Sequence, residues 1–241
     1  FEQAVRDARK DIEIKPRAPF AYEQLAWALI ASQQWEEASR CYEQLIELQP
    51  NKIRHLINLA RCEFMSQGKD AYRQRCRTAI EQFISPEASV QIKRSVVGMC
   101  CSVTNAVDDT EAMVQLARDV MAENPPNEGW TKKVVTQALL CDGQFNEALA
   151  ILLDLEADET DPVRGQTLFV LAKAYHASGK PDLAEDWLKK GDAWTAQYLG
   201  KGEFDPPNGP LTVQVAQKDA HEVLGIPLRT TKNMATVEPK E

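Results

Sequence analysis

The hydrophobic positions between residues 21 and 51 predict two short helices joined by a turn. The first helix is marked by apolar side chains at i, i+3, i+4 and i+7, namely Tyr22, Leu25, Ala26 and Leu29. The second has the same helical spacing at Ala38, Tyr42 and Leu45. Each set lies on one face of a helix, so each helix has one core-facing stripe. Pro50 ends the second helix, because proline cannot continue the hydrogen-bond ladder.

The same pattern returns after 34 residues. The matched pairs are Ala4 and Ala38, Ala8 and Tyr42, Ile14 and Leu48, Pro16 and Pro50, Leu25 and Leu59, and Ala26 and Ala60. A fixed period of this length predicts a stack of helix pairs, each of which buries its apolar face against its neighbours. Small residues such as Ala26 and Ala38 are expected where two helices touch.

Continued along the chain, the pattern predicts one helical domain over residues 1–225. It comprises a half-repeat at 1–16, helix pairs at about 18–50, 52–84, 86–125, 128–156 and 163–200, and a last helix at 211–225. That helix has Val213, Ala216, Ala220, Val223 and Leu224 on one face, and it is expected to cap the open end of the stack. Residues 226–241 are polar and predict a flexible tail. Because Phe1 enters at the second helix of a pair, we expect a piece of a longer or processed protein.

Two segments resemble the tetratricopeptide repeat. The first is marked by Tyr22, Leu25, Ala26, Leu29, Trp35, Ala38, Tyr42, Leu48 and Pro50, and the second by Leu168, Leu171, Ala172, Tyr175, Gly179, Ala184 and Leu188. The resemblance implies an all-α fold, a right-handed α-solenoid of stacked antiparallel helix pairs with a C-terminal capping helix.

From about residue 50 onward, the order of segments also resembles the C-terminal repeat region of modular bacterial serine/threonine kinases of eukaryotic type. The segments include "INLARCEFMSQGKDAYRQRCRTAIEQF", "CDGQFNEALAILLDL" and "VAQKDAHEVLG". This resemblance implies a signalling protein whose catalytic part lies outside these residues.

Composition narrows the class of protein. The chain has 241 residues, 44% hydrophobic and 27% charged, and a net charge of -8. This balance is typical of a globular protein and argues against a nucleic-acid partner, which favours positive charge. No apolar run approaches the roughly 20 residues of a membrane span, and the start lacks the build of a signal peptide. We therefore expect a cytoplasmic protein without membrane insertion.

The cysteines and one acidic pair have two interpretations each. The six cysteines are scattered through helical patterns without a Cys-x-x-Cys clip, which favours buried free thiols over a disulfide framework. The neighbours Cys100 and Cys101 suggest a redox site, yet consecutive helical residues point about 100° apart, and burial is the simpler interpretation. Asp108 and Asp109 suggest a cation site or, more economically, a helix cap.

Catalytic patterns are not found in the sequence. It has neither the glycine loops of nucleotide-binding sites nor the His-Arg-Asp and Asp-Phe-Gly of kinases, and its three histidines lie far apart. The prediction is a non-enzyme, with no cofactor and no bound metal.

Binding to another protein is the function that remains. First helices of stacked pairs line a concave groove, which takes peptides or helices. The resemblance to the tetratricopeptide repeat implies these groove residues: Glu23, Trp27, Ile30, Arg54, Ile57, Asn58, Arg61, Phe64, Lys133, Gln137, Phe169, Lys173 and His176. Arg54, Arg61 and Lys133 favour an acidic or C-terminal carboxylate feature on the partner. The alternative for any one of them is packing or a solvated face, as for Trp27 and Lys173.

Two functions stay open from the sequence. The first is a non-catalytic scaffold that binds a peptide, a helix or a domain in its groove. The second is a regulatory region of a larger kinase, which packs on its neighbouring domain or self-associates through the N-terminal helix. One subfamily of these repeats binds the C-terminal tails of chaperones with a clamp of Lys and Asn side chains. That function is not favoured here, because Glu23 and Gln24 stand where the subfamily has Lys or Asn.

Overall fold

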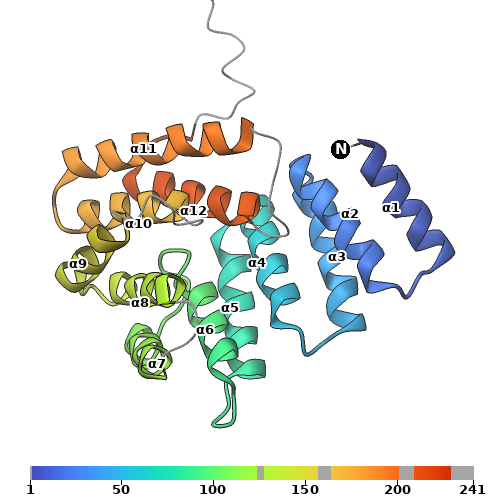
Figure 1. Ribbon diagram of the computed structural model, residues 1–241, viewed down its shortest axis with the longest axis horizontal. Helices are drawn as coiled ribbons and strands as arrows, with labels where there is room; N and C mark the ends of the chain where they lie inside the picture. The colour runs from blue at the N-terminus through green and yellow to red at the C-terminus, as the bar shows by residue number, and fades with distance from the viewer. Residues whose placement is uncertain (1, 124–127, 157–163, 201–208, 229–241) are drawn as a thin grey trace, which may run out of the picture.

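The computed structural model describes residues 2–123, 128–156, 164–200 and 209–228, and within these ranges it contains twelve helices and no strand (Figure 1). The helices are α1 (Glu2–Ile14), α2 (Pro19–Ala31), α3 (Trp35–Leu48), α4 (Ile53–Gln67), α5 (Lys69–Phe83), α6 (Val90–Cys100), α7 (Thr110–Ala122), α8 (Glu128–Cys141), α9 (Phe145–Glu156), α10 (Arg164–Ala177), α11 (Pro181–Gly200) and α12 (Gly209–Leu224). The all-helical solenoid expected from the repeat is confirmed.

Contacts between helices follow their order in the chain. Every helix packs on the next one, and α4, α6, α8 and α10 also contact one another in sequence. From α4 to α10, the first helices of successive pairs therefore form one continuous layer. This nearest-neighbour arrangement is what a stack of repeats produces.

Small residues allow the helices of the first pair to approach closely. Ala26 on α2 and Ala38 on α3 have no exposed surface, and Tyr42 and Leu45 beside them are 1% and 0% exposed. A larger side chain at either alanine would push the two backbones apart. The sequence pattern thus identified the contact between these helices.

The turns inside three pairs share one geometry. Gly143 and Gly179 have φ values of +77° and +72°, and Gln33 has a φ of +56° at the matching place between α2 and α3. In each turn the following residue donates its N–H to a carbonyl five residues back, as Gln34 does to Leu29 at 2.9 Å. This is the left-handed helix ending that glycine suits best. Gln33 adopts it without that advantage.

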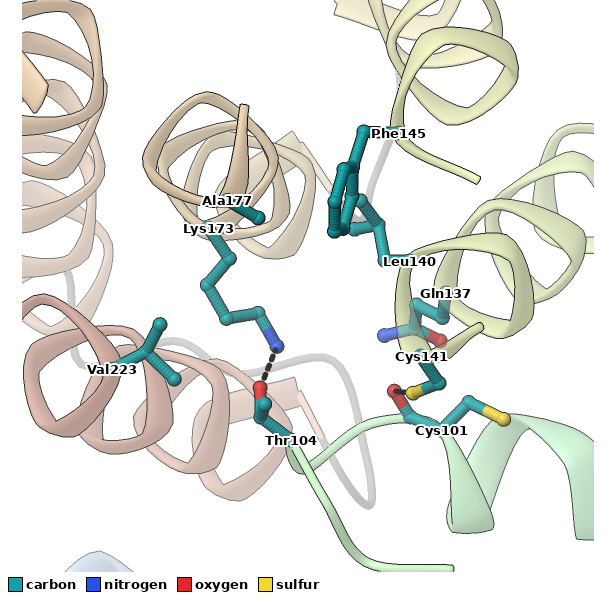
Figure 2. A pocket seen from close by; sticks show the side chains of 9 residues that line it. All are labelled: Cys101, Thr104, Gln137, Leu140, Cys141, Phe145, Lys173, Ala177 and Val223. Atoms are coloured by element: carbon teal, nitrogen blue, oxygen red, sulfur yellow. Dashed lines mark hydrogen bonds between the residues drawn. The ribbon is translucent and has the colours of Figure 1, made fainter. Parts of the chain in front are cut away.

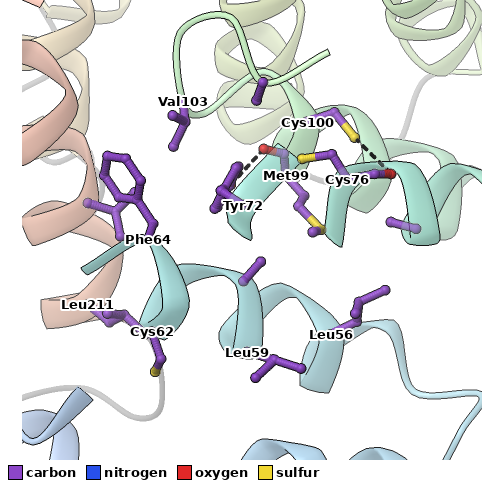
Figure 3. Packing of buried hydrophobic residues seen from close by; sticks show 14 of the residues in the cluster. Leu56, Leu59, Cys62, Phe64, Tyr72, Cys76, Met99, Cys100, Val103 and Leu211 are labelled. Atoms are coloured by element: carbon purple, nitrogen blue, oxygen red, sulfur yellow. Dashed lines mark hydrogen bonds between the residues drawn. The ribbon is translucent and has the colours of Figure 1, made fainter. Parts of the chain in front are cut away.

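Tyr72 replaces the small residue expected in the second pair, between α4 and α5. Its ring meets Phe64 edge-on, with centroids 5.8 Å apart, and its hydroxyl donates to the Met99 carbonyl at 2.8 Å (Figure 3). Tyr72 has no exposed surface. The large side chain therefore links this pair to α6 instead of loosening it.

Helix α12 has two buried sides. Val213, Ala216 and Ala220 pack with Phe169 and Leu188 of α10 and α11. Leu211 and Val215 belong instead to the main core, and Figure 3 shows Leu211 next to Cys62 of α4. α12 thus packs on the last helix pair, as expected, but it also reaches back along the stack to α4 (Figure 1).

Candidate functional site

The predicted groove residues fall into two groups by exposure. In the N-terminal part, Glu23, Trp27 and Ile57 are partly exposed and Arg54 is exposed, while Ile30 and Asn58 are buried. Further along, buried side chains predominate: Arg61, Phe64, Lys133, Gln137, Phe169 and Lys173. His176 is exposed at the end of α10. The expectation of one exposed surface was wrong for the second group.

The exposed part of the groove lies between α2 and α4, and we call it the N-terminal concave site. It is a shallow surface depression whose volume of about 160 Å³ includes open solvent and encloses no space for a water molecule, and it is lined by Glu23, Trp27, Tyr42, Arg54, His55 and Asn58. Arg54 donates to the Glu23 carboxylate at 2.8 Å, and this pair lies at the rim with 46% and 17% of its side chains exposed. The site therefore offers one aromatic surface and an exposed ion pair.

Buried polar atoms lie beneath and beside this site without a hydrogen-bond partner. Asn58 Oδ1 and His55 Nδ1 are two of them, although His55 Nε2 lies 3.0 Å from Gln49 Oε1. Burial lowers the pKa of His55, so the neutral ring is favoured. Most buried polar atoms in proteins are satisfied, and an orphan marks a place where a further partner fits.

Arg61 lies on α4 one turn after Asn58. It is 7% exposed, and among the described residues no carboxylate pairs with it. Its Nε also lacks a hydrogen-bond partner. Burial lowers the pKa of the guanidinium, which nevertheless stays charged at any ordinary pH. A buried arginine of this kind favours an anionic group nearby.

The buried part of the groove is organised around Asp219 of α12. Its carboxylate accepts from Lys173 Nζ at 2.7 Å and from the backbone N and Oγ1 of Thr104 at 3.1 and 2.8 Å. Lys69 Nζ lies 3.4 Å from its other oxygen. Burial alone would raise the pKa of Asp219, but these donors outweigh burial and lower it. Asp219 is therefore a fully buried anion held by two cations.

Two further contacts hold α12 at its sides. Lys218 donates to the carbonyls of Phe64 and Met65 at 2.6 and 3.4 Å, where the helix dipole of α4 favours a cation. On the opposite side, Nε2 of His221 lies 3.1 Å from the Asp192 carboxylate of α11. Burial lowers the pKa of His221, but the bonds to Asp192 and to the Ile226 carbonyl reverse the direction and raise it.

A cavity of about 410 Å³, which includes its open mouth, lies beside this cluster (Figure 2). It is lined by Cys101, Thr104, Gln137, Leu140, Cys141, Phe145, Lys173, Ala177 and Val223. In Figure 2 the Lys173 amine points toward Thr104, and the Cys141 thiol points to the Cys101 carbonyl at 3.8 Å. The cavity is mostly apolar, and its one cation is already engaged by Asp219.

The cysteines are free thiols, as predicted. Five of the six are buried and Cys141 is partly exposed. Burial raises the pKa of Cys41 to about 12, and hydrogen bonding to Cys141 together with burial raises the pKa of Cys101 well above its usual range. Thiols of this kind are poor nucleophiles. Asp109 caps α7 by accepting from the Ala112 N–H at 2.9 Å, so the capping interpretation holds there.

Within the part of the chain that the structure describes, no three metal-ligating side chains gather in one place. No described helix has both the length and the apolar character of a membrane span.

The sequence reasoning did not identify Asp219, Thr104 and Lys218 as important positions. One signal was present: Asp219 follows Ala216 by three positions and precedes Ala220 by one, so it lies within an apolar stripe. A carboxylate at such a position indicates a buried partner, and no pattern in α12 says that the partner is Lys173.

Residues 19–52 and residues 165–190 both match the tetratricopeptide repeat family. No curated protein matches the chain. Among solved structures, the chain is similar to YrrB, described as a tetratricopeptide repeat protein with an unusual peptide-binding site, at 14% identity and a TM-score of 0.44 over 78% of this chain and 92% of that one. It is also similar to PilW, a type IV pilus biogenesis factor, at 17% identity and a TM-score of 0.48 over 85% and 90%. Similarity to solved structures at such low sequence identity shows nothing beyond the fold.

Two segments of the chain thus match the tetratricopeptide repeat, and both lie within an all-helical stack. Proteins of this fold are generally non-catalytic. The resemblance to kinase repeat regions is not tested by these comparisons and stays a prediction.

Proposed function

We propose that this protein is a non-catalytic scaffold that binds a segment of another protein at the N-terminal concave site. The carrying observation is the partly exposed Trp27 surface beside the buried His55, whose Nδ1 has no hydrogen-bond partner. A bound peptide brings both apolar side chains and backbone donors and acceptors, so it satisfies the two features together.

The partner segment is proposed to carry an acidic group. Arg54 is exposed at the rim, and Arg61 lies beyond Asn58 without a carboxylate among the described residues. An aspartate or a C-terminal carboxylate on the partner pairs with the exposed Arg54, which is released in part from Glu23. An exposed ion pair such as Arg54 with Glu23 is worth about 1 kcal/mol or less, so this exchange costs little.

Self-association through α1 has weaker support. The side of α1 away from α2 is polar, with exposed Gln3, Arg6, Asp7, Lys10 and Glu13. Ile14, at 73% exposure, is its most exposed apolar side chain. A polar outer side is typical of the end of a repeat stack rather than of a dimer interface.

The test is peptide selection against the immobilised chain, followed by affinity measurements on variants by isothermal titration calorimetry. Trp27→Ala is expected to weaken the affinity for the selected peptide by about thirtyfold, because it removes an aromatic anchor. Arg54→Glu is expected to weaken this affinity by about tenfold. Arg61→Glu and Lys133→Glu are not suitable, because both side chains are buried and the change would test folding.

A matched control for Arg54 lies on α7, the second helix of a later pair. Arg118 on α7 is 48% exposed and pairs with Glu147 at 3.3 Å, which reproduces the setting of Arg54. Arg118→Glu is expected to leave the affinity unchanged. Equal affinities for wild type, Trp27→Ala and Arg54→Glu would contradict the proposal, as would an equal loss in Arg118→Glu.

A further inference from the structure

Helix α12 lies where the groove of this fold receives a ligand. It covers Phe169 and Lys173 of α10 and Phe64 of α4, three positions that the repeat register directs to the concave side. Figure 3 shows its Leu211 next to Cys62 of α4. The C-terminal part of the groove is therefore occupied by a segment of the same chain.

α12 is enclosed by its neighbours, and between residues 210 and 224 only Glu222 is exposed. Its residues toward α10 and α11 are small, with Val213, Ala216 and Ala220 at 4%, 8% and 0% exposure. Such side chains permit close approach but bury little apolar area each. Much of the specificity instead comes from polar groups, namely Asp219 with Lys173 and Lys218 with the end of α4.

The polar contacts define what the surface beneath α12 selects. Lys173 Nζ and the Thr104 N–H and hydroxyl converge on one carboxylate, which has no exposed surface. A buried ion pair of this type adds little net stability compared with apolar packing, but it strongly disfavours an occupant that lacks the charge.

We propose that α12 is a separable intramolecular occupant that holds closed a second helix-binding surface, formed by α4, α10 and the segment around Thr104. The external partner of this surface is a helix that, like α12, brings small apolar residues and one carboxylate. This inference rests on the proposed scaffold function and adds its regulation: release of α12 extends the N-terminal concave site toward the C-terminal pairs.

The first test is native-state hydrogen exchange on the free wild-type chain in low concentrations of denaturant. A separable occupant opens without unfolding its neighbours, so the amides of α12 are expected to exchange at least about tenfold faster than those of α10. If the amides of both helices exchange together, at the rate of global unfolding, the proposal is wrong. This measurement needs no partner, so its failure is distinct from a failure of the proposed function.

The second test uses a labelled peptide of residues 209–226 as the ligand of full-length variants, measured by fluorescence anisotropy. Asp219→Lys places a cation against Lys173 and is expected to release α12, so that this variant binds the peptide about a hundredfold more tightly than wild type. Glu185→Lys makes the same charge change at an exposed site on α11 and is expected to match wild type.

A variant of the peptide distinguishes specific docking from nonspecific binding. The peptide with Asp219→Asn is expected to bind the Asp219→Lys chain at least about tenfold more weakly than the unchanged peptide. A folded Asp219→Lys chain that does not bind the peptide, or that binds both peptides equally, would overturn the proposal. If Asp219→Lys does not fold, the hydrogen-exchange result alone decides.

Discussion

The helix pairs α2–α3 and α10–α11 both match the tetratricopeptide repeat, yet their concave sides differ. Trp27 is partly exposed, while Phe169 has no exposed surface. Beside α2, Arg54 of α4 keeps 46% of its side chain exposed, against 10% for Lys173 of α10. The difference comes from α12, which lies against α10 and leaves α2 uncovered. Repeat register thus decides which side a residue faces, but a later segment decides whether it is exposed.

The largest expected effect is a difference in the free energy of unfolding between variants of Lys173 and Arg54, the two cations compared above. Lys173→Ala leaves Asp219 buried without its nearest cation, and we expect the free energy of unfolding to fall by about 3 kcal/mol. Arg54→Ala removes only an exposed pair and should cost about 1 kcal/mol or less. Urea denaturation followed by circular dichroism measures both. Similar losses for the two variants would remove the distinction between the halves.

A smaller effect concerns the turns of the same two pairs. Gln33 has a φ of +56°, whereas its counterpart Gly179 has a φ of +72°. The left-handed conformation costs a residue with a side chain about 1 kcal/mol. Gln33→Gly is therefore expected to raise the free energy of unfolding by about 1 kcal/mol, and Gly179→Ala to lower it by a similar amount. Thermal denaturation tests the pair, and a destabilised Gln33→Gly would show that the side chain has another role.

The smallest effect is a pH dependence confined to α12. The pKa of His221 in the folded chain is above its usual 6.5, so its contribution is full below 6.5 and is lost as pH rises through the folded pKa. We expect α12 to exchange faster at pH 8 than at pH 6, after correction for intrinsic exchange. His221→Gln should remove this difference.

The free energy of unfolding of the whole chain is a poor measure of the pH dependence due to His221. Burial lowers the pKa of His55, so its contribution has the opposite sign and is lost as pH falls below 6.5. The amides of α12 report on His221 and its partner Asp192 locally. An unchanged pH dependence in His221→Gln would assign the effect to another group.

Much of the fold could be predicted from the sequence, because helical period and repeat length are local properties of the chain. Ala26 and Ala38 indicated the helix contact, and Gly179 the turn. The exposure of Phe169 and Lys173 could not be predicted in the same way. It depends on where α12 docks, and the contact between Asp219 and Lys173 joins residues 46 positions apart. The position of a docked helix follows from tertiary packing rather than from repeat register.

The most direct test of the central claim, that the concave side is open for a partner only at its N-terminal end, is hydrogen exchange of the full chain with and without a saturating selected peptide. We expect added protection in α2 (Pro19–Ala31) and α4 (Ile53–Gln67), with α7 and α9 unchanged. Protection gained on α7 or α9, and none on α2 and α4, would contradict the account.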